Sequence, residues 1–141
     1  MSSSEPWAQW ISIETVFQLH RQGIEAHGGG GRGVPDVDCV QRSLGAAYNA
    51  EIYNPVEGVG LHGLCFAGCL LFYLSNNSCF PDGNKRVAWA SAMRVLLSFG
   101  LTVRSSTDEA EQFCMDIATG KVKSAQDVTF WLADNITTLP N

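Results

Sequence analysis

The chain has 141 residues, a formal net charge of −5 at pH 7 and 45% hydrophobic residues, but only 16% charged residues. These values predict one globular domain spanning residues 1–141 and exclude a disordered chain or a coiled coil. The acidic balance argues against a nucleic-acid-binding surface, and no apolar run approaches the roughly 18 residues of a membrane span.

The first six residues contain no basic segment followed by an apolar stretch, which is the pattern of a secretory signal. The five cysteines leave an odd one and form no CxxC pair. We therefore expect a cytoplasmic protein whose thiols are reduced.

Hydrophobic spacing predicts an all-α bundle of about six helices. Ser12 is the expected N-cap of a first helix that ends near His27, before the four glycines at 28–31. Asp36 or Asp38 is expected to cap a second helix, and the segment 49–55 is expected to be irregular or extended.

Two strongly apolar helices are predicted in the middle of the chain. The first covers roughly residues 57–74 and is apolar nearly all round, which is typical of a buried central helix. The second covers roughly residues 84–99, with Gly100 just past its end. A short strand or extended link is expected at residues 101–103.

Two more helices are predicted at the C-terminal end. Thr107 is the expected cap of one, because Asp108 and Glu109 in a first turn match the helix dipole. This helix should end at residues 119–120. Ser124 or Ala125 should open the last helix, with Ile136 on its inward face.

The motif segment, residues 78–86, joins the two apolar helices and carries the residues expected to do chemistry. The backbone N–H groups of a helix start bind phosphate, and Gly83 allows close approach to a ligand. Lys85 and Arg86 add positive charge, Asp82 offers the hard oxygen that Mg²⁺ prefers, and Asn84 can donate to phosphate or fix the turn. Phe80 is expected to anchor the segment by burying its ring in the core.

An ordinary Asp-Gly turn before a basic helix start is the simpler interpretation of these residues. Cations in the first turn of a helix oppose its dipole, however, at a cost of about 0.3–1 kcal/mol each. A helix that begins with Lys85 and Arg86 therefore favours an anion-binding site.

The motif segment resembles the motif of death-on-curing (Doc) toxins, a branch of the Fic family, H-x-F-x-[DN]-[AG]-N-K-R, at every position except the first. Lys85 favours Doc, because Fic proteins have glycine there. Weaker similarities to the family lie at Gly33-Val34-Pro35-Asp36 with Leu44, at Ala118-Thr119-Gly120-Lys121 and at Trp131-Leu132.

This resemblance implies the Fic/Doc fold and a toxin of a toxin–antitoxin system. Doc toxins transfer a phosphoryl group from ATP to a hydroxyl of a translation factor of the elongation factor Tu class. By resemblance, Asp82 would help to hold Mg²⁺, and Asn84, Lys85 and Arg86 would hold the ATP phosphates; we also assign Phe80 and Gly83 to this cofactor-binding segment. A cognate antitoxin would be the partner.

Ser78 stands where the family has its catalytic histidine, and Asn76 where it often has arginine. A serine hydroxyl is no useful base at pH 7, and loss of a general base reduces rates by about 10²–10⁴-fold. The sequence leaves open a weakened or silenced kinase, a Fic-like transferase of AMP, and a non-catalytic protein that binds nucleotide or antitoxin.

Other candidate ligands and bases favour structural roles. His62, Cys65 and Cys69 share one helix face, but with no evident fourth zinc ligand we expect the cysteines in the core. His20 and His27 are expected to be packing or surface residues rather than a substitute base. Cys79 beside the loop is a candidate for a thiol of raised reactivity, but the favoured interpretation is that it fills the variable position of the motif. Trp89, one turn after Lys85, is a candidate for flanking the site, but core packing is the favoured interpretation.

Overall fold

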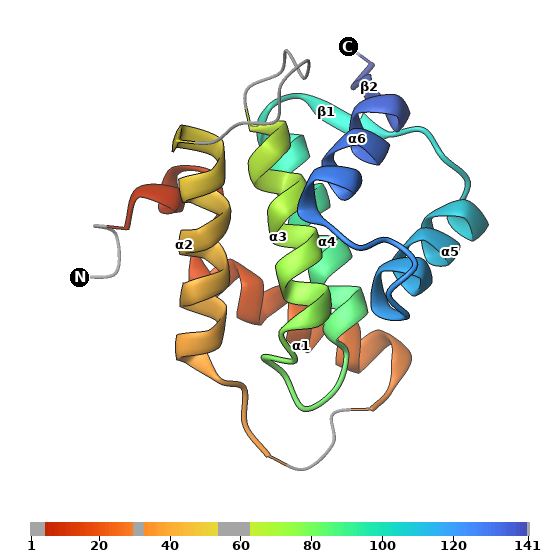
Figure 1. Cartoon of the computed structure of the whole chain (residues 1–141). Coiled ribbons are helices and arrows are strands. Elements are labelled where there is room, and N and C mark those ends of the chain that lie inside the picture. The colour runs from red at the N-terminus through yellow and green to blue at the C-terminus, as the bar shows by residue number, and fades with distance from the viewer. Residues whose placement is uncertain (1–4, 30–32, 54–62, 141) are drawn as a thin grey trace.

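The computed structural model describes residues 5–29, 33–53 and 63–140. Within these residues it contains six α-helices, a short 3-10 helix and two short strands (Figure 1), so the expected mostly helical class is confirmed. In chain order the elements are η2 (Pro6–Gln9), α1 (Ile13–His27), α2 (Val37–Tyr53), α3 (Leu64–Asn76), α4 (Asn84–Ser98), β1 (Leu101–Val103), α5 (Thr107–Ala118), α6 (Ala125–Asn135) and β2 (Ile136–Thr138).

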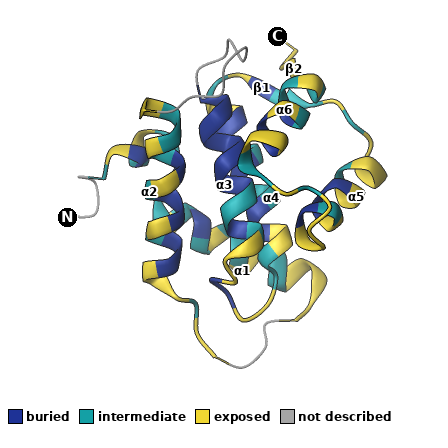
Figure 2. Cartoon of the chain, viewed as in Figure 1, coloured by how far each residue is buried: buried dark blue, intermediate teal, exposed yellow. Residues whose placement is uncertain are grey.

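Helix α3 is the centre of the bundle, as its apolar sequence predicts. All its residues from Leu64 to Leu71 are buried, and α2, α4 and α6 pack around it (Figures 1 and 2). Gly68 sets how closely α6 approaches, because a Cβ there would collide with the side chain and backbone of Thr129. The core is therefore built around one helix that has no polar face.

The start of α3 differs from the prediction of a helix beginning near residue 57. Gly63 is left-handed (φ 86°) and is the N-cap, so the helix begins at Leu64. A residue in this conformation interrupts the helical hydrogen-bond pattern, and apolar content alone does not reveal such a break. Residues 57–62 of the predicted helix, including His62, lie outside the described residues.

The prediction of an irregular segment from residue 49 is wrong as far as Tyr53, because α2 continues to that residue. The last turns of α2 have a tertiary role: the Glu51 carboxylate accepts a hydrogen bond of 3.0 Å from the backbone N–H of Phe66. That contact satisfies the backbone N–H of a residue in the first turn of α3. It also stabilises the last turn of α2, which the helix propensity of residues 49–53 alone does not predict.

Most helix starts are capped as expected. The side chains of Ser12, Asp36 and Ser124 each accept the backbone N–H of the residue three positions later. Thr107 was the wrong choice for α5. Its N-cap is Ser106, which forms a reciprocal capping box with Glu109, so Thr107 is the first helical residue.

The two strands form an antiparallel pair that joins the end of α4 to the end of α6. Leu101 pairs with Thr138 and Val103 with Ile136. The strand at 101–103 is confirmed, but Ile136 lies in β2 rather than on the inward face of the last helix. Across residues 5–29, 33–53 and 63–140, no helix is long and apolar enough to span a membrane.

Candidate functional site

The motif segment forms a short loop after α3 and the first turn of α4. Asn77 caps the end of α3, and the next residue, Ser78, is exposed with a left-handed backbone (φ 51°). Gly83 is also left-handed (φ 79°) and is the N-cap of α4. The predicted loop between two central helices is present, because α3 and α4 pack against each other.

Phe80 anchors this loop, as the sequence predicts. Its side chain is buried, and its ring stacks on the His20 imidazole with the ring centroids 4.1 Å apart. The Phe17 ring meets it edge-on at 5.6 Å. Since both partners lie on α1, the loop is held against that helix by aromatic contact.

Asn84 fixes the turn with both ends of its side-chain amide. Its Oδ1 accepts the backbone N–H of Phe80 at 3.1 Å, and its Nδ2 donates to the Phe80 carbonyl at 2.9 Å. The sequence allowed two roles for Asn84, donation to phosphate or fixing of the turn. In the structure its side chain fixes the turn. The amide thereby satisfies the polar backbone groups of a buried residue.

The first turn of α4 has the features of an anion site. Its N-cap, Gly83, has no side chain, and no side-chain hydrogen bond from the described residues caps this end. The turn contains Lys85 and Arg86 but no acidic residue, and both cations are exposed. Unpaired N–H groups, the positive end of the dipole and two cations therefore lie together.

The expectation of reduced thiols is wrong for two of the five cysteines, because Cys39 and Cys79 form a disulfide. Both are buried, and their α-carbons are 5.4 Å apart. Two hydrogen bonds reinforce this link between the loop and α2: Asp36 N–H donates to the Cys79 carbonyl at 2.7 Å, and Asn77 Nδ2 donates to Ser43 Oγ at 3.0 Å. Cys79 therefore attaches the loop to α2 and is not a reactive thiol. Its partner is 40 residues away in the sequence, so the spacing of the cysteines does not predict this pair.

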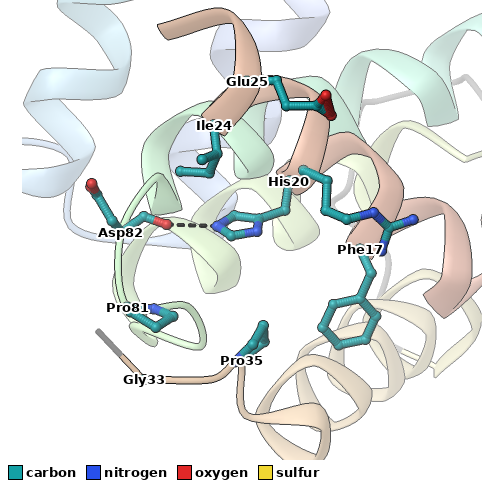
Figure 3. Close-up of a pocket in the computed structure, with 9 residues that line it drawn as sticks. Phe17, His20, Ile24, Glu25, Gly33, Pro35, Pro81 and Asp82 are labelled. Atoms are coloured by element: carbon teal, nitrogen blue, oxygen red, sulfur yellow. Dashed lines mark hydrogen bonds between the residues drawn. The ribbon is translucent and has the colours of Figure 1, made fainter. Parts of the chain in front are cut away.

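His20 contacts the loop directly, which the sequence did not identify. Its Nε2 lies 2.7 Å from the backbone carbonyl of Asp82. A carbonyl oxygen only accepts, so Nε2 carries the hydrogen. A signal was present in the sequence, because His20 shares a helix face with Phe17 and Ile24, which also face the loop (Figure 3).

The predicted site residues line two different cavities. The first, of about 470 Å³, is lined by Asp82, Pro81 and His20 with neighbouring residues of α1 and the segment 33–35 (Figure 3). The second, which we name the α4–α5 groove, has about 860 Å³ and lies between α1, α4, β1 and α5. Its α4 wall consists of Lys85, Arg86, Trp89, Ala90 and Met93. Asp82 therefore lines one cavity, and Lys85 and Arg86 line the other.

Lys85 and Cys114 both line the α4–α5 groove. Burial raises the pKa of the Cys114 thiol to about 11, and the positive charge of Lys85 acts in the opposite direction. Cys114 lies on the α5 side of the groove.

Within the described residues, no group of three or more His, Cys, Asp or Glu residues is placed to hold a metal ion. Asp82 alone offers an exposed carboxylate in the motif segment, and its Oδ1 accepts the N–H of Gly83 at 2.8 Å. One carboxylate suits Mg²⁺ that is held mainly by substrate phosphates and water.

Cys65 and Cys69 are buried in α3, with their sulfur atoms 3.8 Å apart. The hydrogen bond to Cys65 and then burial raise the pKa of the Cys69 thiol far above its ordinary value. His27 is exposed and lines the α4–α5 groove. Trp89 also lines this groove, and its ring contacts the Trp131 ring edge-on.

No protein-family model and no curated protein matches this chain. The resemblance to Doc toxins therefore depends on the motif residues of the sequence alone.

Proposed function

We propose that the chain is a Doc-type phosphotransferase of a toxin–antitoxin pair, weakened at Ser78, that binds ATP at the first turn of α4. The observation that supports it best is the uncapped, doubly cationic helix start, held by Gly83 and the amide of Asn84. Phosphate is the common anion that suits fixed backbone N–H groups with a flanking lysine and arginine.

Asp82 would hold Mg²⁺ together with the phosphates, because its carboxylate is exposed one residue before the N-cap. When bound, the ion supplies charge neutralisation at the transferred group. The residues of the chain supply position: Lys85 and Arg86 neutralise phosphate oxygens, and Gly83 lets the ligand approach the backbone. The acceptor would be a hydroxyl of a translation factor, and the cognate antitoxin would block this surface.

A non-catalytic role in nucleotide or antitoxin binding is the second candidate, and two positions favour it. Ser78 carries no group that accepts a proton at pH 7. Asn76 stands where the family often has arginine, and its amide donates to the Phe72 carbonyl at 2.8 Å. Its side chain is thus directed back along α3. The Fic-like alternative, transfer of AMP, has no such observation in its favour, because Lys85 fills the position of the family's glycine.

Labelled ATP separates these functions, with the purified chain and the Ser78→His variant incubated with a translation factor. Histidine is among the residues that tolerate a left-handed backbone, so the variant should keep the loop shape. We expect γ-label transfer by Ser78→His at a rate about 10²–10⁴-fold above that of the unmodified chain. Transfer of α-label instead would indicate nucleotidylation. Absence of transfer, also when Asn76→Arg is added, would support the non-catalytic role.

Calorimetry tests the binding step separately from transfer. Lys85→Ala should weaken Mg²⁺–ATP binding without lowering the melting temperature, because Lys85 is exposed and surface substitutions change stability by only about 0.5 kcal/mol. Lys121→Ala, at another exposed lysine, is the matched control and should bind as the unmodified protein does. Equal binding by both variants would contradict the phosphate site at α4.

A further inference from the structure

We propose that the Cys39–Cys79 disulfide is a redox switch for position 78, and that it acts on this position without changing the phosphate-binding turn, residues 80–84. The described part of the motif segment has one set of contacts to α1 and another to α2, and the disulfide belongs to the second set. The catalytic consequence of the switch rests on the proposed function. Its effect on the loop itself is independent of that function.

The contacts to α1 hold the phosphate-binding turn. The Phe80 ring stacks on the His20 imidazole, and His20 Nε2 donates to the Asp82 carbonyl at 2.7 Å. The side-chain amide of Asn84 bonds both backbone groups of Phe80. None of these contacts involves a sulfur atom, so reduction of the disulfide should leave the turn as it is.

The contacts to α2 hold the residues just before that turn. Cys79 is bonded to Cys39 in the first turn of α2. The Cys79 carbonyl accepts the backbone N–H of Asp36 at 2.7 Å, and Asn77 Nδ2 donates to Ser43 Oγ at 3.0 Å. The disulfide is the covalent member of this set, so its loss should weaken these contacts and not those to α1.

Ser78 lies between the two residues that α2 holds. Its backbone is left-handed (φ 51°), and it is the only non-glycine residue with a positive φ among those that the structure describes. Such a conformation is unfavourable for a residue with a Cβ, and it persists where neighbouring contacts impose it. When the covalent contact is lost, position 78 should therefore leave this conformation.

The reduced cysteines would also have polar partners at this place. The Cys39 sulfur lies 3.6 Å from the Asn77 carbonyl oxygen, and the Cys79 sulfur lies 3.9 Å from Ser43 Oγ. In the disulfide neither sulfur carries a hydrogen, but as thiols both become donors, the first to a carbonyl and the second to a hydroxyl. Both redox states are therefore compatible with the surrounding structure.

A dithiol is the class of reductant that would break the bond. Its first thiolate attacks one sulfur atom and releases the other cysteine as a thiolate, which leaves a mixed disulfide. The second thiolate of the dithiol then attacks the mixed disulfide, so the reductant leaves as a cyclic disulfide and each cysteine thiolate takes a proton from water. Exchange with a small disulfide reverses these steps.

The bond lies close to the surface, although both of its cysteines are buried. Asp38 and Ser78, which precede the two cysteines in the chain, are exposed, and so is Asn77. Displacement of residues 77–79 would therefore give a dithiol access to the sulfur atoms without the unfolding of a helix. Openings of this local kind occur in folded proteins more often than global unfolding.

Hydrogen exchange of two backbone amides, measured by NMR in the full chain, separates the two sets of contacts. The Asp36 amide donates to the Cys79 carbonyl and reports the contact with α2. The Phe80 amide donates to Asn84 Oδ1 and reports the turn. On reduction with dithiothreitol, well below the melting temperature, we expect exchange at Asp36 to become about tenfold faster or more and exchange at Phe80 to change by less than about twofold.

Two variants control for the identity of the switch. Cys39→Ala should behave as the reduced chain does, with or without dithiothreitol. Cys69→Ala is the matched control and should respond to dithiothreitol as the unmodified chain does, because its sulfur lies 3.8 Å from that of Cys65 and forms the other close pair. If Cys39→Ala does not fold, the unmodified chain in its two redox states still decides the question.

The catalytic consequence is measured in the Ser78→His variant. Reduction should lower transfer of γ-label about tenfold or more, because a catalytic group that is displaced by about 1 Å loses most of its effect. The affinity for Mg²⁺–ATP in calorimetry should not change, since the turn keeps its contacts to α1. If the variant transferred no label in either state, the proposed function would fail, and the amide exchange would still decide the switch.

Three results would overturn the inference. The first is equal exchange of the Asp36 amide in both redox states. The second is an equal acceleration at Asp36 and Phe80, because the disulfide would then stabilise the whole loop and not position 78 alone. The third is peptide mapping that finds Cys39 and Cys79 as thiols after incubation with oxidised glutathione, because the bond would then not form.

Discussion

The disulfide between Cys39 and Cys79 should contribute a large part of the stability of the protein. It closes a loop of 40 residues that contains most of α2 and all of α3. The chain-entropy relation for a loop of this size gives about 4 kcal/mol, and native disulfides measured in small domains contribute about 2–5 kcal/mol. Reduction should therefore lower the free energy of unfolding by about 2–4 kcal/mol.

Thermal unfolding followed by circular dichroism, with and without a phosphine reductant, measures this effect. With an unfolding entropy of about 2.1 cal/mol/K per residue, the expected loss corresponds to a decrease in melting temperature of about 7–14 °C. The double variant Cys39→Ala, Cys79→Ala is the control. Its melting temperature should be low already and should not respond to the reductant, because the three other cysteines are not disulfide-bonded.

Two results would refute this reasoning. If peptide mapping under non-reducing conditions found the bond, but reductant did not lower the melting temperature, loop closure would not stabilise this chain. If mapping found both residues as thiols, the loop would be held only by its hydrogen bonds and the packing of Phe80. The second result would restore the original expectation of reduced cysteines.

Three further substitutions test the packing. Gly68→Ala should lower stability by about 1–3 kcal/mol in chemical denaturation, because its Cβ would collide with the Thr129 backbone; Gly45→Ala, also helical but with space for a methyl group, should be neutral or stabilising. Ser106→Ala should cost about 0.5–2 kcal/mol through loss of the α5 cap, and unchanged stability would contradict the capping box. His20→Phe should keep the stacking but lose the hydrogen bond to the loop, so hydrogen exchange of the loop amides should increase while the melting temperature changes little.

The sequence predicts best what depends on neighbouring residues. The periodic apolar face and the Ser12 cap define α1 at both ends, because these signals act within one or two turns. The buried anchor Phe80 was likewise expected from the loop pattern alone. Local patterns therefore account for the elements and for the shape of the motif segment.

What the sequence did not predict depends on partners far along the chain. The extension of α2 accompanies the contact of Glu51 with α3, and Ile136 is in a strand because it pairs with Val103. The contact of His20 with Asp82 joins residues 62 positions apart. A single sequence has no signal that selects such partners, because each of these residues is also compatible with the structure first expected for it.

The two hydrogen bonds of the Asn84 amide have a consequence for how the loop meets any ligand. They join Asn84 to Phe80 through groups of the chain itself, so the protein's own hydrogen bonds hold the shape of the turn. The entropy of ordering these residues is then lost at folding and not again at binding. The loop backbone should therefore change little when a ligand binds. Association should be fast, and the backbone amides of the loop should have nearly the same protection from hydrogen exchange with and without the ligand.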